Sequence, residues 1–201
     1  MGLQQYWKKR NFQRTPEPRG KNVPPDGRLR FVIQKHAASR LHYDFRLELN
    51  GTLKSWAVPK GPSLDPAQKR LAVHVEDHPL EYAGFEGVIP EKQYGGGTVL
   101  LWDRGYWEPI GDPGSSYRRG RLTFSLHGEK LHGIWNLVRM GGRKEGGKEN
   151  WLLIKEDDEE AQRGKRGDIT QTLEESVASG KTLEQIAAGE HAVWQSKRPS
   201  G

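Results

Sequence analysis

A group of side chains that can bind a metal and an anion lies between residues 34 and 49. Two histidines, His36 and His42, and one carboxylate, Asp44, are ligand types that zinc, manganese and iron accept. Arg46 follows two residues later, and a guanidinium can hold a phosphate or carboxylate through two parallel hydrogen bonds. This combination indicates metal-assisted chemistry on an anionic substrate.

Apolar and polar residues alternate from Leu41 to Leu49, which predicts a half-buried β-strand. His42, Asp44, Arg46 and Glu48 would project from one face, and His36 lies on the approach to this strand. A solvated strand face is the other interpretation of these charges. Asn50-Gly51 is typical of a type I′ hairpin turn leading into a second strand over Thr52–Val58. The opposite, apolar face would carry Leu41, Tyr43, Phe45, Leu47 and Leu49.

A second set of polar residues suits phosphoryl transfer, which needs cations on the phosphate oxygens and a proton donor for the leaving group. Lys60 lies in a rigid turn between Pro59 and Pro62, and Arg70 precedes a predicted strand. Each is equally well explained as an ordinary surface cation. The candidate phosphate ligands are Arg46, Lys60, Arg70 and His78, with Tyr82 beside His78.

Composition narrows the class of protein. The chain of 201 residues has 33% apolar residues and no cysteine, which excludes disulfides, thiolate catalysis and cysteine-ligated zinc. No run reaches the ~18 apolar residues that a membrane span requires, and no signal peptide is recognisable, so a cytoplasmic location is expected. The first 35 residues carry nine lysines and arginines against two acidic residues, which suits a polyanion such as nucleic acid.

Many short strands separated by glycine and proline predict a mostly β protein, a small antiparallel β-barrel. The expected organisation is a flexible, basic and non-helical N-terminal arm over 1–28, a barrel over 29–156 and a short helical C-terminal tail or inter-domain connector over 157–201. Capping-box patterns predict helices at Thr172–Ser179 and Thr182–Ala188. Further strands are expected at Arg28–Lys35, Arg70–Glu76, Thr98–Asp103, Tyr106–Pro109, Arg121–Leu126, Gly133–Met140 and Asn150–Lys155, with Trp56, Trp102, Trp135 and Trp151 in the core.

The order of these residues resembles the phosphoesterase domain of bacterial ligase D, a multifunctional end-joining DNA ligase. The resemblance covers most of residues 6–155, and its most specific part runs from His36 to Glu48. Lys92 stands where the family pattern has glycine. The matching segments are Arg10 with Arg14–Pro18, Gln34–Glu48, Lys54–Pro62, Val75–Pro79 with Tyr82, Phe85–Gly87 with Ile89-Pro90, and Tyr94-Gly95.

The resemblance implies a manganese-type ion held by His36, His42 and Asp44. It further implies a metal-dependent 3′-phosphodiesterase and 3′-phosphomonoesterase, which removes a terminal ribonucleoside and then the remaining 3′-phosphate. The substrates would be DNA or RNA-tipped primer-template 3′ ends, and Ku and the polymerase and ligase modules of ligase D would be partners of a monomeric domain. The implied phosphate-site and catalytic residues are Arg10, Glu17, Arg46, Lys60, Arg70, His78 and Tyr82.

Two other functions are compatible with parts of the pattern. A non-haem iron and 2-oxoglutarate dioxygenase would use His42, Asp44 and a distant histidine such as His132, with Arg139 as co-substrate anchor. It would leave His36 and His78 without a task. A non-catalytic barrel that binds nucleic-acid ends would need only the basic arm and exposed aromatic residues. The sequence leaves open whether water attacks the phosphate directly or the 2′-hydroxyl forms a cyclic intermediate.

Overall fold

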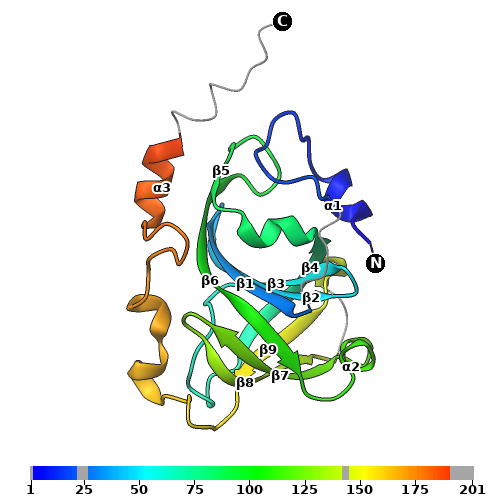
Figure 1. Ribbon diagram of the computed structural model, residues 1–201, viewed down its shortest axis with the longest axis vertical. Coiled ribbons are helices and arrows are strands. Elements are labelled where there is room, and N and C mark those ends of the chain that lie inside the picture. Colours follow the sequence, from blue (N-terminus) through cyan, green and yellow to red (C-terminus); the bar gives the residue numbers. More distant parts are fainter. Residues whose placement is uncertain (1, 22–26, 142–144, 191–201) are drawn as a thin grey trace, which may run out of the picture.

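The computed structural model describes residues 2–21, 27–141 and 145–190 (Figure 1). Its body is one antiparallel sheet in the order β1-β2-β3-β4-β9-β8-β7-β6-β5, and β1 also pairs with β6. This second pairing closes eight strands into a barrel, which confirms the predicted fold class. The strands are β1 (Leu29–Ala37), β2 (Leu41–Leu49), β3 (Thr52–Val58), β4 (Arg70–His78), β5 (Gly87–Ile89), β6 (Gly97–Pro109), β7 (Arg121–Gly128), β8 (His132–Arg139) and β9 (Asn150–Lys155).

Large aromatic side chains fill the barrel. Trp56, Trp102 and Trp135 are 0% exposed and Trp151 is 1% exposed, as their strand positions predicted. Burying one such ring removes about 150–250 Å² from water, which contributes roughly 4–6 kcal/mol of transfer free energy. The apolar residues of β2 from Tyr43 onward join this core, so the polar residues of that strand must face outward.

The turn between β2 and β3 fixes the register of the outward-facing residues. Asn50 and Gly51 have φ values of 53° and 80°, as a type I′ turn requires. Leu49 therefore pairs with Thr52. Further along the ladder Arg46 pairs with Ser55 and Asp44 pairs with Ala57. Small side chains on β3 leave room above Asp44 and Arg46.

Strand β6 is continuous, whereas the sequence predicted two strands broken at Arg104-Gly105. Gly105 does not break the strand. Glycine is needed there because a Cβ would lie 2.0 Å from the carbonyl oxygen of His127 on β7. One edge of β6 pairs with β1, and the other pairs first with β5 and then with β7. The short strand β5 was not predicted.

The N-terminal arm packs against the barrel over residues 2–21. Helix α1 (Gln4–Lys8) precedes the prolines, so the prediction that the arm forms no helix is wrong. Tyr6 is fully buried, and its ring lies against His78 and Tyr82 at centroid distances of 5.0 and 6.1 Å. A 3-10 helix, η1 (Leu80–Gly84), covers the same outer face of the sheet (Figure 1).

The C-terminal segment is also part of the packed structure. Helix α3 (Leu183–Glu190) is close to the prediction, and Thr182 and Gln185 exchange the two hydrogen bonds of a capping box. No helix forms over Thr172–Ser179. Instead the indole of Trp102 donates to the carbonyl of Leu173, which draws this stretch onto the barrel.

Helix α2 (Pro113–Arg119) was missed as well as α1. It begins at Asp112, whose carboxylate accepts from the Ser115 amide, and ends at left-handed Gly120. No described helix is long and apolar enough to cross a membrane. The remaining 3-10 turns are Glu145–Gly147, Gly164–Gly167 and Ile169–Gln171.

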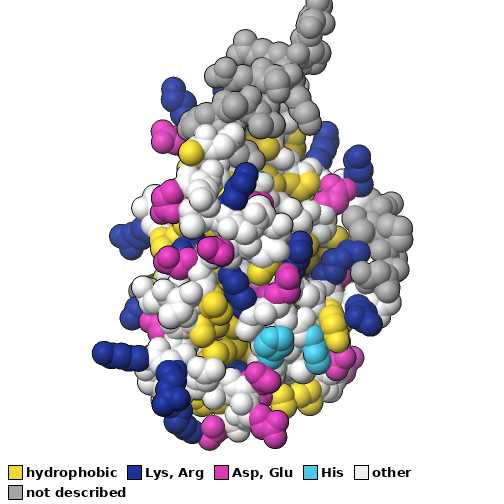
Figure 2. All heavy atoms as spheres, turned by 60° about the vertical axis from the view of Figure 1, so that its left-hand side comes forward, with side chains coloured by type: hydrophobic (Ala, Val, Ile, Leu, Met, Phe, Trp, Pro, Cys, Tyr) yellow, Lys and Arg dark blue, Asp and Glu magenta, His cyan; other side chains and the backbone are white. Residues whose placement is uncertain are grey.

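Charge on the surface is mixed. On the face that carries the C-terminal segment, lysine and arginine side chains are interspersed with acidic ones among the residues drawn in colour (Figure 2). No large single-sign patch dominates that face. The concentration of titratable groups that could handle a substrate lies instead in a cleft on the outer face of β1–β4.

Candidate functional site

The cleft lies outside the barrel, between the sheet and the N-terminal arm, and measures about 330 Å³. In the β1–β2 ladder His36 pairs with His42, Gln34 with Asp44 and Val32 with Arg46. Asp44 and Arg46 are only 7% and 2% exposed, so the expectation of a half-buried strand is wrong for β2. Its polar face is covered as well, and Tyr82 of η1 lies over Arg46 there.

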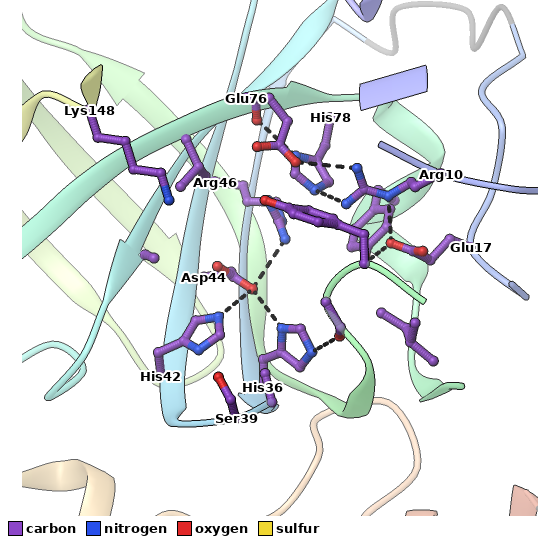
Figure 3. A pocket seen from close by; sticks show the side chains of 17 residues that line it. Arg10, Glu17, His36, Ser39, His42, Asp44, Arg46, Glu76, His78 and Lys148 are labelled. Atoms are coloured by element: carbon purple, nitrogen blue, oxygen red, sulfur yellow. Dashed lines mark hydrogen bonds and ion pairs between the residues drawn. The ribbon is translucent and has the colours of Figure 1, made fainter. Parts of the chain in front are cut away.

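Three potential metal ligands converge in the cleft (Figure 3). Nδ1 of His36 and Nε2 of His42 lie 3.5 and 3.4 Å from Oδ2 of Asp44, and the three ligand atoms lie within 4.8 Å of one another. Ligands at ~2.0–2.2 Å from one ion stand roughly 3–3.5 Å apart. The two nitrogen–oxygen distances therefore fit a single divalent ion with small adjustments.

Both imidazoles are oriented by peptide carbonyls. Nε2 of His36 lies 2.7 Å from the carbonyl oxygen of Gly95, and Nδ1 of His42 lies 3.0 Å from that of Arg40. Because a carbonyl oxygen can only accept, these nitrogens carry the protons. The other two nitrogens face Asp44. They donate to its carboxylate when the rings are protonated, and they present lone pairs to a metal when the rings are neutral.

The electrostatics keep Asp44 ionised. Burial alone would raise its pKa, but Arg46 and hydrogen bonds from His36 and His42 hold the pKa of this carboxyl well below its usual range. Burial also lowers the pKa of His42, yet the hydrogen bond to Asp44 outweighs it and the net shift is upward. The cluster therefore carries the negative charge and the ring nitrogens that a cation would use.

Arg46 has one guanidinium nitrogen without a hydrogen-bond partner in the described structure. Its Nε donates to Oε1 of Gln34 at 2.7 Å, Nη2 lies 3.4 Å from Asp44, and the guanidinium carbon is 4.9 Å from the centroid of the Tyr82 ring. Its Nη1 is buried without a hydrogen-bond partner in the described structure. Such a donor is costly to leave unpaired, and an anion in the cleft would satisfy it.

A second cation reaches the cleft from the arm. Arg10 pairs through Nε with Glu17 at 2.8 Å and through Nη1 with Glu76 at 3.2 Å. Its Nη2 lies 3.3 Å from Nε2 of His78. Figure 3 shows Arg10 and Lys148 entering the cleft from opposite sides.

Comparison with known proteins identifies the family of this chain. Residues 34–139 match the family described as the DNA ligase D 3′-phosphoesterase domain. The chain belongs to this family. The match includes the three candidate metal ligands, Arg46 and His78, and it confirms the predicted resemblance.

Relatives of this phosphoesterase domain include multifunctional non-homologous end joining proteins. The LigD protein of Pseudomonas aeruginosa is 56% identical over 90% of this chain, and that of Mycolicibacterium smegmatis is 39% identical over 93%. The LigD protein of Mycobacterium tuberculosis is 46% identical over 70% of the chain. The chain spans 22%, 25% and 18% of these proteins, about a fifth of their length. It is therefore similar to one module of a larger repair protein.

Two predicted members of the phosphoesterase site lie outside the cleft lining. Lys60 is exposed, and its carbonyl accepts a hydrogen bond from Nη1 of Arg70 at 3.2 Å. Because neither side chain lines the cleft, they are left out of the phosphate site proposed below. The remaining predicted residues are together there: Arg10, Glu17, His36, His42, Asp44, Arg46, His78 and Tyr82.

His78 and Tyr82 contact each other and the N-terminal arm. The Tyr82 hydroxyl donates to Glu17 at 3.0 Å, while its ring meets the edge of His78 at 4.7 Å. Nδ1 of His78 is 2.9 Å from the carbonyl of Glu76, so it carries the proton. Burial, Arg46 and Arg10 hold the pKa of His78 well below its usual range, and the imidazole is neutral.

Several residues of this phosphoesterase cleft were missed by sequence reasoning. Glu76 and Tyr94 line the cleft, and Gln34 holds Arg46 from behind it; all three stand within the matching segments, but nothing in their spacing signalled a role. Lys148 lies in a glycine-rich stretch that gave no signal. The dioxygenase alternative loses its distant ligand, because His132 and Arg139 lie on β8 and neither lines the cleft.

Proposed function

We propose that this phosphoesterase domain repairs 3′ ends of nucleic acid in two hydrolytic steps. The first removes a 3′-terminal ribonucleoside and leaves a 3′-phosphate, and the second converts that phosphate to a 3′-hydroxyl for end joining. Membership of the 3′-phosphoesterase family supports the reaction class. The observation that carries the proposal is the buried, unpaired Nη1 of Arg46 beside the cluster of His36, His42 and Asp44.

The metal in this proposal is Mn²⁺. His36, His42 and Asp44 would hold it, since their lone pairs converge and a mixed nitrogen and oxygen donor set suits manganese, zinc or iron. When bound, such an ion supplies Lewis-acid polarisation of a phosphate oxygen.

The protein's own cations bind the phosphate. Arg46 donates its free Nη1–H to a non-bridging oxygen, because Nε and Nη2 are already held by Gln34 and Asp44. Arg10 offers a second guanidinium from the arm. Charge that develops on these oxygens in the transition state strengthens both interactions, and removing one such donor costs about 10²–10³ in rate.

Glu17 acts by positioning Arg10. Its carboxylate already accepts from Arg10, Thr15 and Tyr82, which leaves it poorly placed to bind a ribose 2′-hydroxyl. His78 accepts from Arg10 through Nε2 and helps to orient the same guanidinium. Because this imidazole is neutral and its one N–H is bonded to the carbonyl of Glu76, His78 acts through Arg10, and proton donation from an imidazolium form is disfavoured at neutral pH.

The wider assembly is also part of the proposal. The substrates are DNA or RNA-tipped primer-template ends, and Ku and the polymerase and ligase modules are partners of the complete repair protein. The printed names of the relatives support a role in non-homologous end joining for those proteins.

The test uses a labelled primer-template with one 3′-ribonucleotide, incubated with and without Mn²⁺, followed by product sizing. The expected products are a primer shortened by one nucleoside that bears a 3′-phosphate, and later the 3′-hydroxyl form. His42→Ala should abolish both products, whereas His132→Ala, on β8 away from the cleft, should keep them. If no divalent ion supports release of either product and binding persists, the domain is an end-binding module and the proposal is wrong.

A further inference from the structure

Tyr94 has no task in the chemistry described above, yet it lines the cleft and is 45% exposed. Most large aromatic residues here are buried, since exposing such a ring forgoes several kcal/mol of transfer free energy. An exposed aromatic ring beside a cleft that handles nucleic acid has an obvious ligand in the flat face of a nucleobase.

The backbone fixes Tyr94 next to the metal ligands. The carbonyl of the adjacent residue, Gly95, accepts from Nε2 of His36. The loop before it is closed by hydrogen bonds from Gln93 to Pro90 and from Gly96 to Gln93, at 2.9 and 3.0 Å. The ring therefore stands on a short, tightly bonded turn, one residue before the carbonyl that is hydrogen-bonded to His36.

The turn has little freedom to move. A Cβ at Gly96 would lie 2.7 Å from the carbonyl oxygen of Pro90, and one at Gly97 would lie 2.0 Å from that of Ala37. Gly95 has a φ of 71°, in the left-handed region. Close packing and backbone geometry thus restrict the turn that carries the ring, which lowers the entropic cost of stacking.

Two cations lie over the Tyr94 ring. Nζ of Lys9 lies 4.9 Å and the guanidinium carbon of Arg10 lies 5.4 Å from its centroid. Lys9 also donates to the Tyr94 hydroxyl at 3.3 Å and pairs with Glu76 at 3.1 Å. An aromatic face beside positive charge is the combination that binds single-stranded nucleic acid without sequence preference.

We infer that Tyr94 is a stacking platform for the nucleobase next to the scissile phosphate, and that it positions the 3′ end over the candidate metal ligands. The inference rests on the proposed function and adds a determinant of substrate binding. Stacking tolerates every base, because each has a π-face. An enzyme that repairs ends of any sequence needs this kind of contact.

The test compares Tyr94→Phe with Tyr94→Ala on the one-ribonucleotide primer. Phe keeps the ring and removes only the hydrogen bond from Lys9, so its KM should stay near that of the wild type. Ala removes the ring, and its KM should rise about 5- to 150-fold, with a smaller change in kcat. Ile110→Ala, 51% exposed and outside the cleft, controls for loss of a surface apolar residue.

Substrates that lack a base identify the contact. Two primers each lack one base, either that of the terminal or that of the penultimate nucleotide. On the primer that lacks the base stacked on Tyr94, wild type and Tyr94→Ala should have the same KM. Equal KM values for wild type and Tyr94→Ala on the intact primer would overturn the inference, as would an equal defect in Phe and Ala, which would assign the role to the hydroxyl. Failure of the proposed function would be seen separately, as an inactive wild type.

Discussion

His36 and His42 are direct partners across the β1–β2 ladder, with ring centroids 4.8 Å apart. One hairpin therefore supplies all three candidate ligands. His36 lies on β1, and His42 and Asp44 lie two residues apart on β2. A register slip of one residue would turn His42 and Asp44 into the barrel, so the pairing itself specifies the site.

Metal binding is expected to stabilise the protein. Mn²⁺ at 100 times its dissociation constant should raise the unfolding free energy by about 2.7 kcal/mol, because the ligands are assembled only in the native hairpin. His42→Ala should show no such gain in a thermal unfolding experiment, whereas His132→Ala should respond like the wild type. An equal shift in His42→Ala would place the ion elsewhere.

Arg46→Lys should lower kcat/KM by about 10²–10³, because the single nitrogen of an ammonium cannot reach the positions of Gln34, Asp44 and a phosphate oxygen that the guanidinium fork spans. The measurement is steady-state kinetics on the ribonucleotide primer, with Mn²⁺ affinity measured in parallel and expected to change less. Arg121→Lys, an exposed change on β7, is the matched control. Retention of wild-type kcat/KM by Arg46→Lys would remove this guanidinium from phosphate binding.

His74 should make stability depend on pH. It is buried on β4, where Nε2 lies 2.7 Å from the Tyr117 hydroxyl, and burial lowers its pKa despite nearby Glu149 and Asp77. The unfolded chain takes up a proton near pH 6.5 and the native state resists it, so this contribution is complete above pH 6.5 and declines as the pH falls below it.

Urea unfolding at pH 7 and pH 5 measures the effect. The loss of unfolding free energy between the two values should be smaller in His74→Gln than in the wild type. An unchanged loss would show that other groups account for the acid sensitivity.

Asp103 is expected to be a structural carboxylate of the barrel. It is 0% exposed and accepts the backbone amides of Arg104, Glu129, Lys130 and Leu131. Asp103→Ala should lower the unfolding free energy by about 2–5 kcal/mol, since buried amides lose their acceptor. Chemical denaturation tests this, and a change below about 0.5 kcal/mol would contradict it.

The C-terminal segment should contribute to the stability of the barrel. Ile169 and Ile186 are 7% and 4% exposed and belong to the main core cluster. Ile186→Ala should therefore cost about 2–5 kcal/mol, whereas Leu173→Ala, 41% exposed, should cost much less. Equal and small effects would support the prediction that residues after 156 form a separable connector.

Local patterns predicted the hairpin, and the three candidate ligands lie close together on it. Alternation along β2 and the Asn50-Gly51 turn are properties of neighbouring residues, so they fix which side chains share a face. Gly105 led to the wrong prediction of a strand break. Glycine is needed there because of a carbonyl on β7, which is distant in sequence. Helix α2 was within reach, since Asp112, Pro113 and Gly120 are ordinary start and stop signals.

Long-range packing accounts for what the sequence did not reveal. A basic, proline-rich arm suggested a solvated tail, yet Tyr6 and Glu17 are buried against the face that carries Arg46. The resemblance supplied Arg10 and Glu17 as site residues, which periodicity alone could not. It also suggested Lys60 and Arg70, whose side chains lie outside the cleft lining. The capping pattern at Thr172 did not form a helix, and Leu173 instead accepts from Trp102.

Both imidazoles are hydrogen-bonded to peptide carbonyls, those of Gly95 and Arg40, and these carbonyls carry no net charge. Asp44 is thus the single formal anion facing a divalent cation, and the occupied centre would retain about one surplus positive charge. A centre with this surplus attracts the reactant phosphate and the released phosphate alike. Inorganic phosphate should therefore act as a competitive inhibitor, and slow departure of this product would limit turnover at high phosphate concentration.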